Sequence, residues 1–494
     1  MAGIAQSDAV GAADALALAD PAQIAPPPAR GAPLFAHLAD LTMFWGPASG
    51  GVRRYVGAKR AFLERQAGWC HSTVVPASTA PSLRRQGAPA GAALGADVAI
   101  PSLPLPFAPG YRIARSRRRA TEVLVRLAPD LIEAGDPYNL AWAALDAAAE
   151  LDVPAIAFAH SDLPALAARV GGARAEALAR RYLAHLYPRF DRVLAPNRAL
   201  CARLRALGVD AVWQPLGVDT TCFSPQRRDP AWRERLAVDD DQRVVLFAGR
   251  FAPEKNLHVL ARAVARLGPR YVLVLIGGGP VRVADGPFAG QVRALPFERE
   301  PAALARALAS CDVFAHAGDI ETFGLAPLEA MACGTPVVVR KRGGLADLVD
   351  DRVGCAIDAE PDQLCAAFAS AIRRLCDEAG APAGQARRAA ARQRALGYDW
   401  DVLLPRLAQR YATLIHLRAT RLGGRRRAGD NPTVGGRPLR SAPDELIALA
   451  AAAGAAQFER AEAGALHDWH RPGRPLEPLE PLEPLEPLEP IPRG

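Results

Sequence analysis

Short apolar runs that lack polar alternation recur along most of the chain, and helical patterns separate them. In the first half the runs lie at 33–41, 71–77, 129–135, 153–160 and 191–197. In the second half they lie at 243–250, 270–279, 291–297, 311–318 and 335–340. The clearest helical stretches between them lie at 53–67, 172–187, 256–267, 301–309 and 326–333. Strands that are apolar on both faces and are joined by helices form parallel sheets covered on both sides, so the chain is predicted to be α/β.

Two such blocks in tandem predict two doubly wound, Rossmann-like domains facing across a cleft. The length of 494 residues agrees, because one hydrophobic core rarely serves so long a chain. We place the domains at 34–217 and 218–395, with a boundary near Gly217 and a closing helix at 396–420 that packs back on the core. Ligands of open parallel sheets bind at the carboxyl ends of the strands, so the cleft is the expected active site.

Both ends of the chain differ in composition from this core. Residues 1–33 are rich in Ala, Pro and Gly, which predicts a disordered leader. Residues 421–494 contain a basic linker (421–437), an Ala-rich helix near 443–464 and, from Arg474, five Pro-Leu-Glu triplets. Proline at every third position excludes helix and sheet hydrogen bonding, so this tail is expected to be extended and the segment mostly disordered.

Charge and cysteine usage narrow the class of protein. The net charge of +8 suits an anionic ligand or an anionic membrane surface and does not require nucleic acid. The eight cysteines show neither a CxxC pair nor zinc-finger spacing, so reduced thiols and a cytosolic location are expected. The acidic start argues against a secretory signal, and the apolar run at 446–456 is shorter than the roughly 20 residues of a spanning helix.

The stretch "LFAGRFAPEKNL" (246–257) places two cations where a parallel strand ends. The strand ends at Gly249, Arg250 follows it, and Lys255 precedes the next helix. Arginine can bind two oxygens as a fork and lysine adds a point charge, so the pair suits a doubly charged anion at a helix N-terminus. Ordinary surface cations on a solvated loop are the alternative.

The stretch "VLIGGGPV" (274–281) carries a strand into three glycines. Gly277 and Gly279 would let the backbone approach a ligand closely, and a simple tight turn explains them equally well. The GxGxxG spacing of a dinucleotide site is absent.

The stretch "ETFGLAPLEA" (321–330) brackets an apolar segment with two glutamates. Pro327 fits a first helical position, which puts Glu321 on the entering loop and Glu329 in the first helical turn. Backbone N–H groups around Phe323–Leu325 would then form an anion site between two carboxylates. Hydroxyls on either side of a diphosphate, as in a sugar nucleotide, fit this arrangement. A solvated loop and a helix-capping glutamate are the alternative.

Five motifs in order resemble the retaining glycosyltransferases of glycosyltransferase family 4, also called glycosyl transferases group 1. They are "PLGVDTTCFSP" (215–225), "GRFAPEKN" (249–256), "IGGGP" (276–280), "ETFGLAPLEAMACGTPVVV" (321–339) and "RGGLADLVDDRVG" (342–354). The match runs from about Phe35 to Ile415. The resemblance implies the GT-B fold, two Rossmann-like domains with no metal required.

The resemblance also implies roles for the residues of the second domain. Arg250 and Lys255 match the pair that holds the donor diphosphate, and Glu321 matches the first glutamate of the E-x7-E motif, which contacts the donor sugar. Glu329 matches the glutamate that binds the nucleotide ribose. The donor contacts are completed by Gly249, Gly277, Gly279, Phe323, Gly324 and Leu325.

In the first domain the resemblance points to an acceptor side. Gly50 and Gly51, in "GPASGGVRRYV" (46–56), match a glycine-rich loop after the first strand. His160 ends a strand and resembles a family histidine near the reaction centre, although a structural histidine is an equal alternative. Asp136 is a further acceptor-side candidate.

The expected function is transfer of a mannose- or glucose-type sugar from a nucleoside diphosphate donor to an acceptor hydroxyl, with retained configuration, in glycan, glycolipid or polysaccharide synthesis. No metal site and no cofactor are expected, and the donor base, UDP or GDP, stays open. The basic stretch at 111–127 suggests peripheral contact with anionic lipid on the inner membrane face, or a solvated helix. A phosphorylase on the same fold and a non-catalytic nucleotide-sugar-binding protein are the alternatives.

Overall fold

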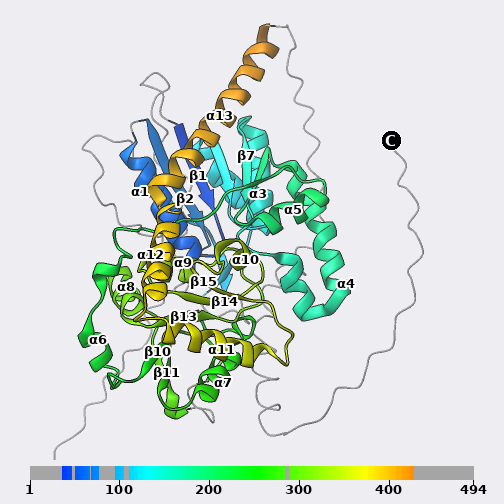
Figure 1. Cartoon of the computed structure of the whole chain (residues 1–494). Coiled ribbons are helices and arrows are strands. Elements are labelled where there is room, and N and C mark those ends of the chain that lie inside the picture. The colour runs from blue at the N-terminus through cyan, green and yellow to red at the C-terminus, as the bar shows by residue number, and fades with distance from the viewer. Residues whose placement is uncertain are drawn as a thin grey trace, which may run out of the picture.

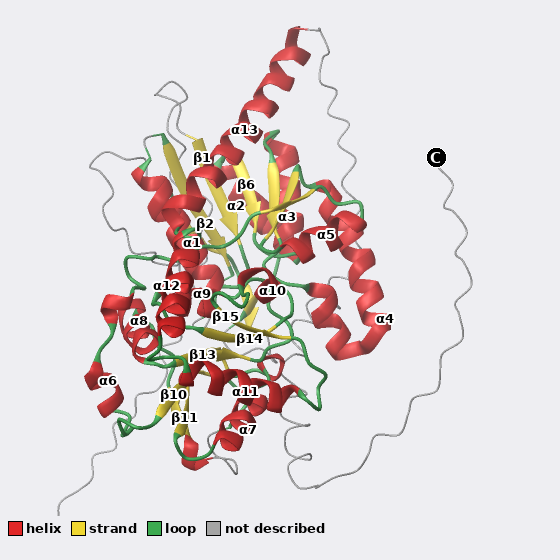
Figure 2. Ribbon diagram, in the orientation of Figure 1, coloured by secondary structure: helices red, strands yellow, loops and turns green. Residues whose placement is uncertain are grey.

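The computed structural model describes residues 36–46, 50–66, 68–76, 95–104, 111–283 and 289–427. They form two α/β domains stacked on one another, with a long C-terminal helix running from the second domain onto the first (Figure 1). Each domain is built around one parallel sheet with helices on both faces (Figure 2). This is the architecture predicted from the apolar runs.

The N-terminal domain contains a seven-stranded parallel sheet in the order β3-β2-β1-β6-β7-β8-β9. Its strands are β1 (Ala36–Leu41), β2 (Trp69–Val75), β3 (Asp97–Ala99), β6 (Leu131–Ala134), β7 (Ala155–Phe158), β8 (Arg192–Ala195) and β9 (Ala211–Trp213). Its helices are α1 (Gly51–Arg65), α2 (Arg117–Leu127), α3 (Asn139–Leu151), α4 (Leu163–Leu186) and α5 (Arg198–Ala206). Two short strands, β4 (Ser102–Pro104) and β5 (Arg112–Ala114), follow β3 in the sequence and form a separate antiparallel pair.

The C-terminal domain contains a six-stranded parallel sheet in the order β12-β11-β10-β13-β14-β15. Its strands are β10 (Arg243–Arg250), β11 (Tyr271–Gly278), β12 (Val292–Leu295), β13 (Val313–His316), β14 (Val337–Arg340) and β15 (Gly354–Ile357). Its helices are α6 (Pro230–Glu234), α7 (Leu257–Leu267), α8 (Pro301–Ser310), α9 (Leu325–Ala332), α10 (Gly344–Leu348), α11 (Leu364–Asp377) and α12 (Pro382–Leu396).

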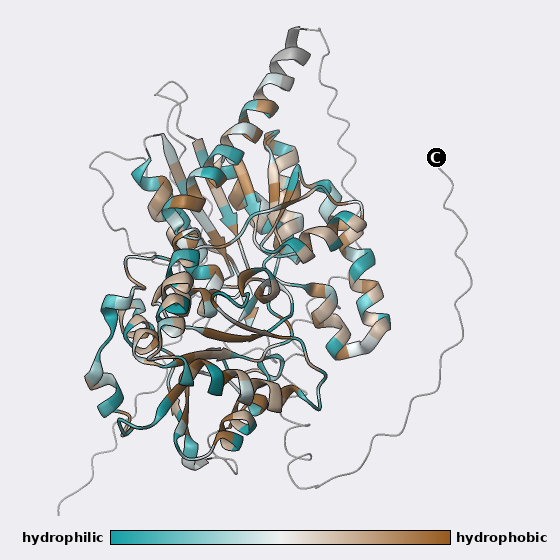
Figure 3. Ribbon diagram, in the orientation of Figure 1, coloured by the Kyte–Doolittle hydropathy of each residue, from teal (hydrophilic) through white to brown (hydrophobic). Residues whose placement is uncertain are grey.

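The apolar runs lack alternation because both faces of each central strand are buried. In β10, Val244 and Leu246 pack into one hydrophobic cluster while Val245 and Phe247 pack into another, and all four are fully buried. Strands β13 and β14 at the centre of the C-terminal sheet are brown, the colour of hydrophobic residues (Figure 3). Burial of a large apolar side chain contributes about 1.5–3 kcal/mol, so the two-sided sheets dominate the stability of each domain.

The strand order of both sheets reverses next to the first strand. Connections run outward in one direction from β1 and in the other from β6, and likewise from β10 and β13. Open parallel sheets bind ligands in the crevice at such a switch point, outside the carboxyl ends of the strands. The fold therefore offers one binding crevice in each domain.

Two chain segments cross between the domains side by side. Val218 N donates to Tyr398 O at 2.9 Å, and Trp400 N donates to Val218 O at 3.2 Å. A side chain on Gly217 would lie 2.6 Å from the Trp400 ring, so only glycine permits this crossing. The predicted boundary at Gly217 falls on this crossing.

Helix α13 (Trp400–Arg427) joins the C-terminal domain to the N-terminal domain. Asp401 pairs with Arg65 of α1 at 2.9 Å, and Arg418 pairs with Asp152 at 2.7 Å. The helix continues to Arg427, so residues 421–427 of the expected linker are helical instead. Leu422 and the arginines of this segment favour a helix, whereas Gly423 and Gly424 disfavour it.

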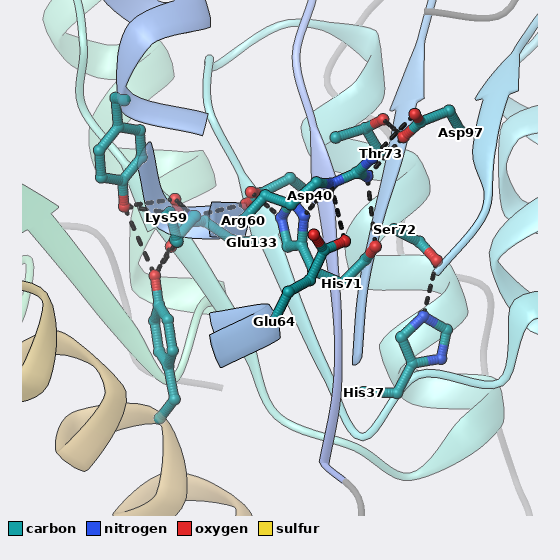
Figure 4. A network of polar contacts seen from close by, with 12 residues as sticks. His37, Asp40, Lys59, Arg60, Glu64, His71, Ser72, Thr73, Asp97 and Glu133 are labelled. Atoms are coloured by element: carbon teal, nitrogen blue, oxygen red, sulfur yellow. Dashed lines mark hydrogen bonds and ion pairs between the residues drawn. The ribbon is translucent and has the colours of Figure 1, made fainter. Parts of the chain in front are cut away.

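A buried charge network fixes α1 and α13 to the N-terminal sheet (Figure 4). Lys59 Nζ lies 2.7 Å from both Asp40 Oδ1 and Glu133 Oε1, and Tyr411 of α13 donates to the other Glu133 oxygen. Burial raises the pKa of the Glu133 carboxyl, although Lys59 opposes the shift. Burial alone would raise the pKa of Asp40, but Lys59 and His71 outweigh it and lower that pKa to about 2. One buried cation thus serves two carboxylates from neighbouring strands.

Several sequence expectations can be compared with these elements. Each of the ten apolar runs overlaps a strand, and the helix predicted at 172–187 is the second half of α4, which breaks at Gly171 and Gly172. All eight cysteines are free, and five of them are buried. Within the described ranges no helix is long and apolar enough to cross a membrane. The predicted leader, the Ala-rich helix and the Pro-Leu-Glu tail lie outside the described residues.

Candidate active site in the interdomain cleft

A cavity of about 360 Å³ lies between the two domains, at the carboxyl ends of the strands beside both switch points. Met43 and Phe44 line it from beyond β1, and Phe247–Arg250 line it from the end of β10. Most of the predicted site residues meet here: Gly50, Gly51, His160, Gly249, Arg250, Lys255, Glu321, Phe323, Gly324, Leu325 and Glu329.

Lys255, Glu321 and His316 form a connected polar cluster in the cavity wall. Lys255 Nζ lies 2.7 Å from Glu321 Oε2, and His316 Nε2 lies 3.4 Å from the same oxygen. The Gly318 amide donates to His316 Nδ1 at 3.2 Å, so Nε2 carries the proton that points to Glu321. Burial alone would raise the pKa of Glu321, but Lys255 and His316 lower it well below the usual range. Glu321 is therefore an ionised carboxylate and not a general acid.

The loop after β10 is folded to hold both cations at the cavity. Pro253–Lys255 form a 3-10 turn that ends on Asn256, which has a positive φ of 50°. Asn256 Nδ2 donates to Ala317 O at 3.1 Å and to Asp319 Oδ2 at 2.9 Å. Arg250 Nη2 lies 3.0 Å from Glu254 Oε1. These bonds fix Lys255 and Arg250 relative to the end of β13.

Helix α9 begins at the cavity. Gly324 caps it with φ 102°, and a side chain there would lie 2.5 Å from Leu345 Cδ2. Leu325–Pro327 line the cavity, so the N-terminus of the helix faces it. The helix starts at Leu325, which makes Pro327 its third residue and Glu329 its fifth. The prediction of Glu329 in the first turn is wrong, and a capping role no longer explains this glutamate.

Glu329 is buried, with its carboxylate in the cavity wall and only 3% exposed. Arg54, from α1 of the opposite domain, forms an ion pair with its Oε1 atom. Its Oε2 atom has no hydrogen-bond partner within the described part of the chain. Burial raises the pKa of this carboxyl, and Arg54 opposes the shift.

His160 lies just beyond β7 and faces the cavity. Its ring stacks on Phe158 with 4.1 Å between the centroids, and its backbone oxygen accepts from Thr322 Oγ1 of the other domain at 2.8 Å. Burial and then the charge of Lys59 lower its pKa to about 3. The imidazole is therefore neutral near pH 7, which excludes it as a permanent cation for phosphate.

The predicted glycines have different positions. Gly51 lies so close to α9 that a side chain would approach Leu325 Cδ1 to 3.2 Å, whereas Gly50 faces open space. Gly277 and Gly279 do not line the cavity. A side chain on either would collide with the backbone of Gly249 or Phe251, so they allow β11 to pack closely beside the loop after β10. Direct donor contact by these two stays a prediction.

Asp136 also lies behind the cavity wall instead of in it. Its carboxylate accepts the amides of Met43 and Tyr138, and burial raises its pKa to about 6. It braces the loops that follow β1 and β6. The structure does not place it among the residues that line the cavity, where an acceptor was expected to bind.

Sequence reasoning missed three features of the site. His316 could have been found, because it is the last residue of the buried strand β13. No sequence motif pointed to Arg54, since its partner Glu329 lies 275 positions away in the chain. Phe44, Tyr111 and Tyr138 form an aromatic wall of edge-to-face contacts on the N-terminal-domain side of the cavity, at centroid distances of 6.4 and 6.0 Å from Phe44. In the described ranges no group of three His, Cys, Asp or Glu side chains could hold a metal ion.

Comparisons with known proteins agree with this geometry. The family model described as Glycosyltransferase Family 4 matches residues 49–222, and the model described as Glycosyl transferases group 1 matches residues 228–394. The chain is 34% identical over 333 residues to a GDP-mannose-dependent alpha-mannosyltransferase of Mycolicibacterium smegmatis, covering 65% of this chain and 84% of that protein.

Two further similarities extend the comparison. A GDP-mannose-dependent alpha-(1-6)-phosphatidylinositol dimannoside mannosyltransferase of Mycobacterium tuberculosis is 30% identical, covering 72% of this chain and 91% of that protein. Sucrose-phosphate synthase from Thermosynechococcus elongatus has the same fold, with a TM-score of 0.61, 20% identity, and coverage of 77% of this chain and all of that one. With two matching family models in order on two parallel-sheet domains, this chain is a GT-B protein that belongs to the glycosyl transferases group 1, glycosyltransferase family 4.

Proposed function

We propose that this chain transfers mannose from GDP-mannose to a hydroxyl of a glycolipid acceptor, with retained anomeric configuration and without a metal ion or other cofactor. The choice of donor is supported by the names of the relatives from Mycolicibacterium smegmatis and Mycobacterium tuberculosis. The lipid-linked acceptor is supported by the second of these, which acts on a phosphatidylinositol dimannoside.

The observation that carries the proposal is the arrangement of charge around the cavity. Arg250 and Lys255 bring two cations to the carboxyl end of β10, and the N-terminus of α9 faces the same space. Two carboxylates, Glu321 and Glu329, flank that helix terminus at either end of the segment that lines the cavity. A diphosphate between the cations and the helix would place a sugar at Glu321 and a ribose at Glu329.

The chemistry follows from this placement. The acceptor oxygen forms a bond to the anomeric carbon while the bond from that carbon to the donor phosphate oxygen breaks. The electron pair of the broken bond leaves with GDP, whose charge Arg250 and Lys255 stabilise. A phosphate oxygen of the leaving GDP takes the acceptor proton on the same face of the sugar, which retains the configuration.

The protein residues act by position and charge in this scheme. Glu321 is held ionised by Lys255 and His316, so it is suited to accept hydrogen bonds from sugar hydroxyls. His160 is neutral and lies on the acceptor side, where it can contact the sugar or the incoming hydroxyl. No side chain needs to form a covalent bond to the sugar.

A ligand panel tests the donor class first. Thermal unfolding of the full chain is measured with GDP, UDP, ADP and inorganic phosphate, each with EDTA and with added Mg²⁺. We expect GDP to raise the melting temperature most, equally in both conditions. Stabilisation by phosphate alone would indicate a phosphorylase, and the absence of stabilisation by any nucleotide would contradict the proposal. GDP binding with no turnover of GDP-mannose on any mannosylated lipid acceptor would indicate a non-catalytic binding protein.

Membrane contact through residues 111–127 stays a prediction. In helix α2, Arg117 pairs with Asp146, and Arg118 pairs with Glu122. These ion pairs neutralise part of the positive charge that anionic lipid would need. Co-sedimentation with vesicles that contain or lack anionic lipid tests the contact. Equal binding to both kinds of vesicle would contradict the prediction.

A further inference from the structure

Arg54 is the cation that the N-terminal domain brings to the nucleotide side of the cavity. It lies in the first turn of α1, three residues after Gly51. Its side chain crosses the cleft to Glu329 Oε1 on α9, and its guanidinium is also 5.9 Å from the ring of Phe223, next to the interdomain crossing. The pair therefore joins residues of two domains at one wall of the cavity.

Glu329 has unused hydrogen-bonding capacity at the same place. The carboxylate is 3% exposed, and Oε2 has no partner in the part of the chain that the structure describes. A buried carboxylate oxygen without a donor costs free energy, so this atom is poised to accept a hydrogen bond from a ligand in the cavity. The ion pair uses one oxygen of the carboxylate and leaves the other available.

We propose that Arg54 is a positioning residue for the nucleotide: its ion pair across the cleft fixes the Glu329 carboxylate so that Oε2 can accept a hydrogen bond from the ribose hydroxyls. The inference rests on the proposed function, in which Glu329 binds the ribose. It adds that a residue of the acceptor-side domain controls affinity for the donor.

The position of the two partners gives this pair a second consequence. Because Arg54 and Glu329 belong to different domains, the ion pair exists only when the domains are as close as they are here. Nucleotide binding and closure of the cleft therefore favour each other, since each stabilises the same arrangement of Glu329.

Direct contact between Arg54 and the diphosphate is the competing account, and the ribose separates the two. If Arg54 acts through Glu329, its contribution requires the ribose hydroxyls. If it binds phosphate, its contribution persists when those hydroxyls are removed. A 2′,3′-dideoxy nucleotide keeps the diphosphate and lacks the hydroxyls, so it distinguishes these cases without a change of fold.

The experiment measures the dissociation constants of GDP and 2′,3′-dideoxy-GDP by calorimetry on the full chain. The variants are Arg54→Met, Arg54→Lys, Glu329→Gln and the double variant Arg54→Met/Glu329→Gln. Arg53→Met is the matched control. It removes the same charge from the neighbouring residue, whose side chain stacks on Trp45. Circular dichroism checks that each variant is folded.

We expect Arg54→Met to weaken GDP binding by about ten-fold, the scale of one charge-assisted hydrogen bond, and Arg54→Lys to recover part of the loss. In the Glu329→Gln background, and with the dideoxy nucleotide, the same substitution should have almost no effect. Arg53→Met should bind GDP as the wild type does. Equal losses for GDP and its dideoxy analogue, or no loss for Arg54→Met, would overturn the inference. If the wild-type chain binds no GDP, the proposed function itself fails.

Discussion

The ammonium of Lys255 and the carboxylate of Glu321 lie 2.7 Å apart in the wall of the cleft. Both side chains are largely buried, at 13% and 19% exposure, so water screens their interaction only weakly. The pair connects the loop after β10 to the loop before α9, and His316 adds a hydrogen bond to the same carboxylate oxygen. In the proposed mechanism, this cluster positions a cation for the leaving phosphate and a hydrogen-bond acceptor for the sugar hydroxyls.

Replacing Lys255 with Ala should lower kcat by about 100-fold or more, because the leaving diphosphate loses a preorganised positive charge. The chain should still fold, but the melting temperature should fall, because the variant leaves the Glu321 carboxylate without its ionic partner. Lys255→Arg should retain more activity than Lys255→Ala. Steady-state kinetics with GDP-mannose measure the effect, and near-wild-type turnover by Lys255→Ala would remove Lys255 from the mechanism.

The two glutamates of the E-x7-E motif should respond differently to the same substitution. Glu321→Gln should lower kcat and leave the affinity for GDP nearly unchanged, because GDP has no sugar at that position. Glu329→Gln should weaken GDP binding and change kcat less. The two variants are matched in chemistry, so each is the control for the other. Parallel losses of kcat and GDP affinity in both would contradict the separate assignments.

His316 should act as a neutral group throughout the useful pH range. Burial lowers its pKa below the usual value, although Glu321 opposes the shift, so it does not gain a proton near pH 7. His316→Gln should lower kcat about ten-fold by loosening Glu321, and by the same factor at every pH from 6 to 9. A pH–rate profile of both proteins measures this, and an acidic limb that disappears in the variant would show that His316 titrates instead.

The contact between Tyr411 and Glu133 should contribute to stability and not to chemistry. Tyr411→Phe removes the donor and leaves a buried carboxylate oxygen with less hydrogen bonding. We expect the free energy of unfolding to fall by about 1–3 kcal/mol, measured by urea denaturation. Tyr398→Phe is the control, because its hydroxyl makes no hydrogen bond in the described part of the chain. Equal stability of the two variants would contradict the role of the network in docking α13.

Local sequence was sufficient for the fold and for half of the site. The strands could be predicted because both of their faces are buried, so polar and apolar residues do not alternate along them. The pairs Arg250–Lys255 and Glu321–Glu329 could be predicted because short motifs at strand and helix ends contain them. The strands β3, β9 and β15 were missed since they are short edge segments of three or four residues.

Contacts between the domains could not be predicted in this way. Arg54 contacts Glu329 only because the two domains face one another. No local sequence pattern indicates a contact between residues that lie 275 positions apart. The same holds for Asp136 and for Gly277 and Gly279, whose packing against neighbouring backbone places them behind the cavity wall. Glu329 was assigned to the wrong turn because Gly324, not Pro327, sets the start of α9.

The product formed from GDP-mannose tests the proposed function most directly. The full-length chain is incubated with GDP-mannose, EDTA and a mannosylated phosphatidylinositol acceptor, and the new glycosidic linkage is determined by NMR together with the amount of GDP released. The proposed function predicts an α-linked mannoside, formed in equal amount to GDP and without metal. A β-linked product, a strict requirement for a divalent metal ion, or release of mannose 1-phosphate in place of GDP would contradict it.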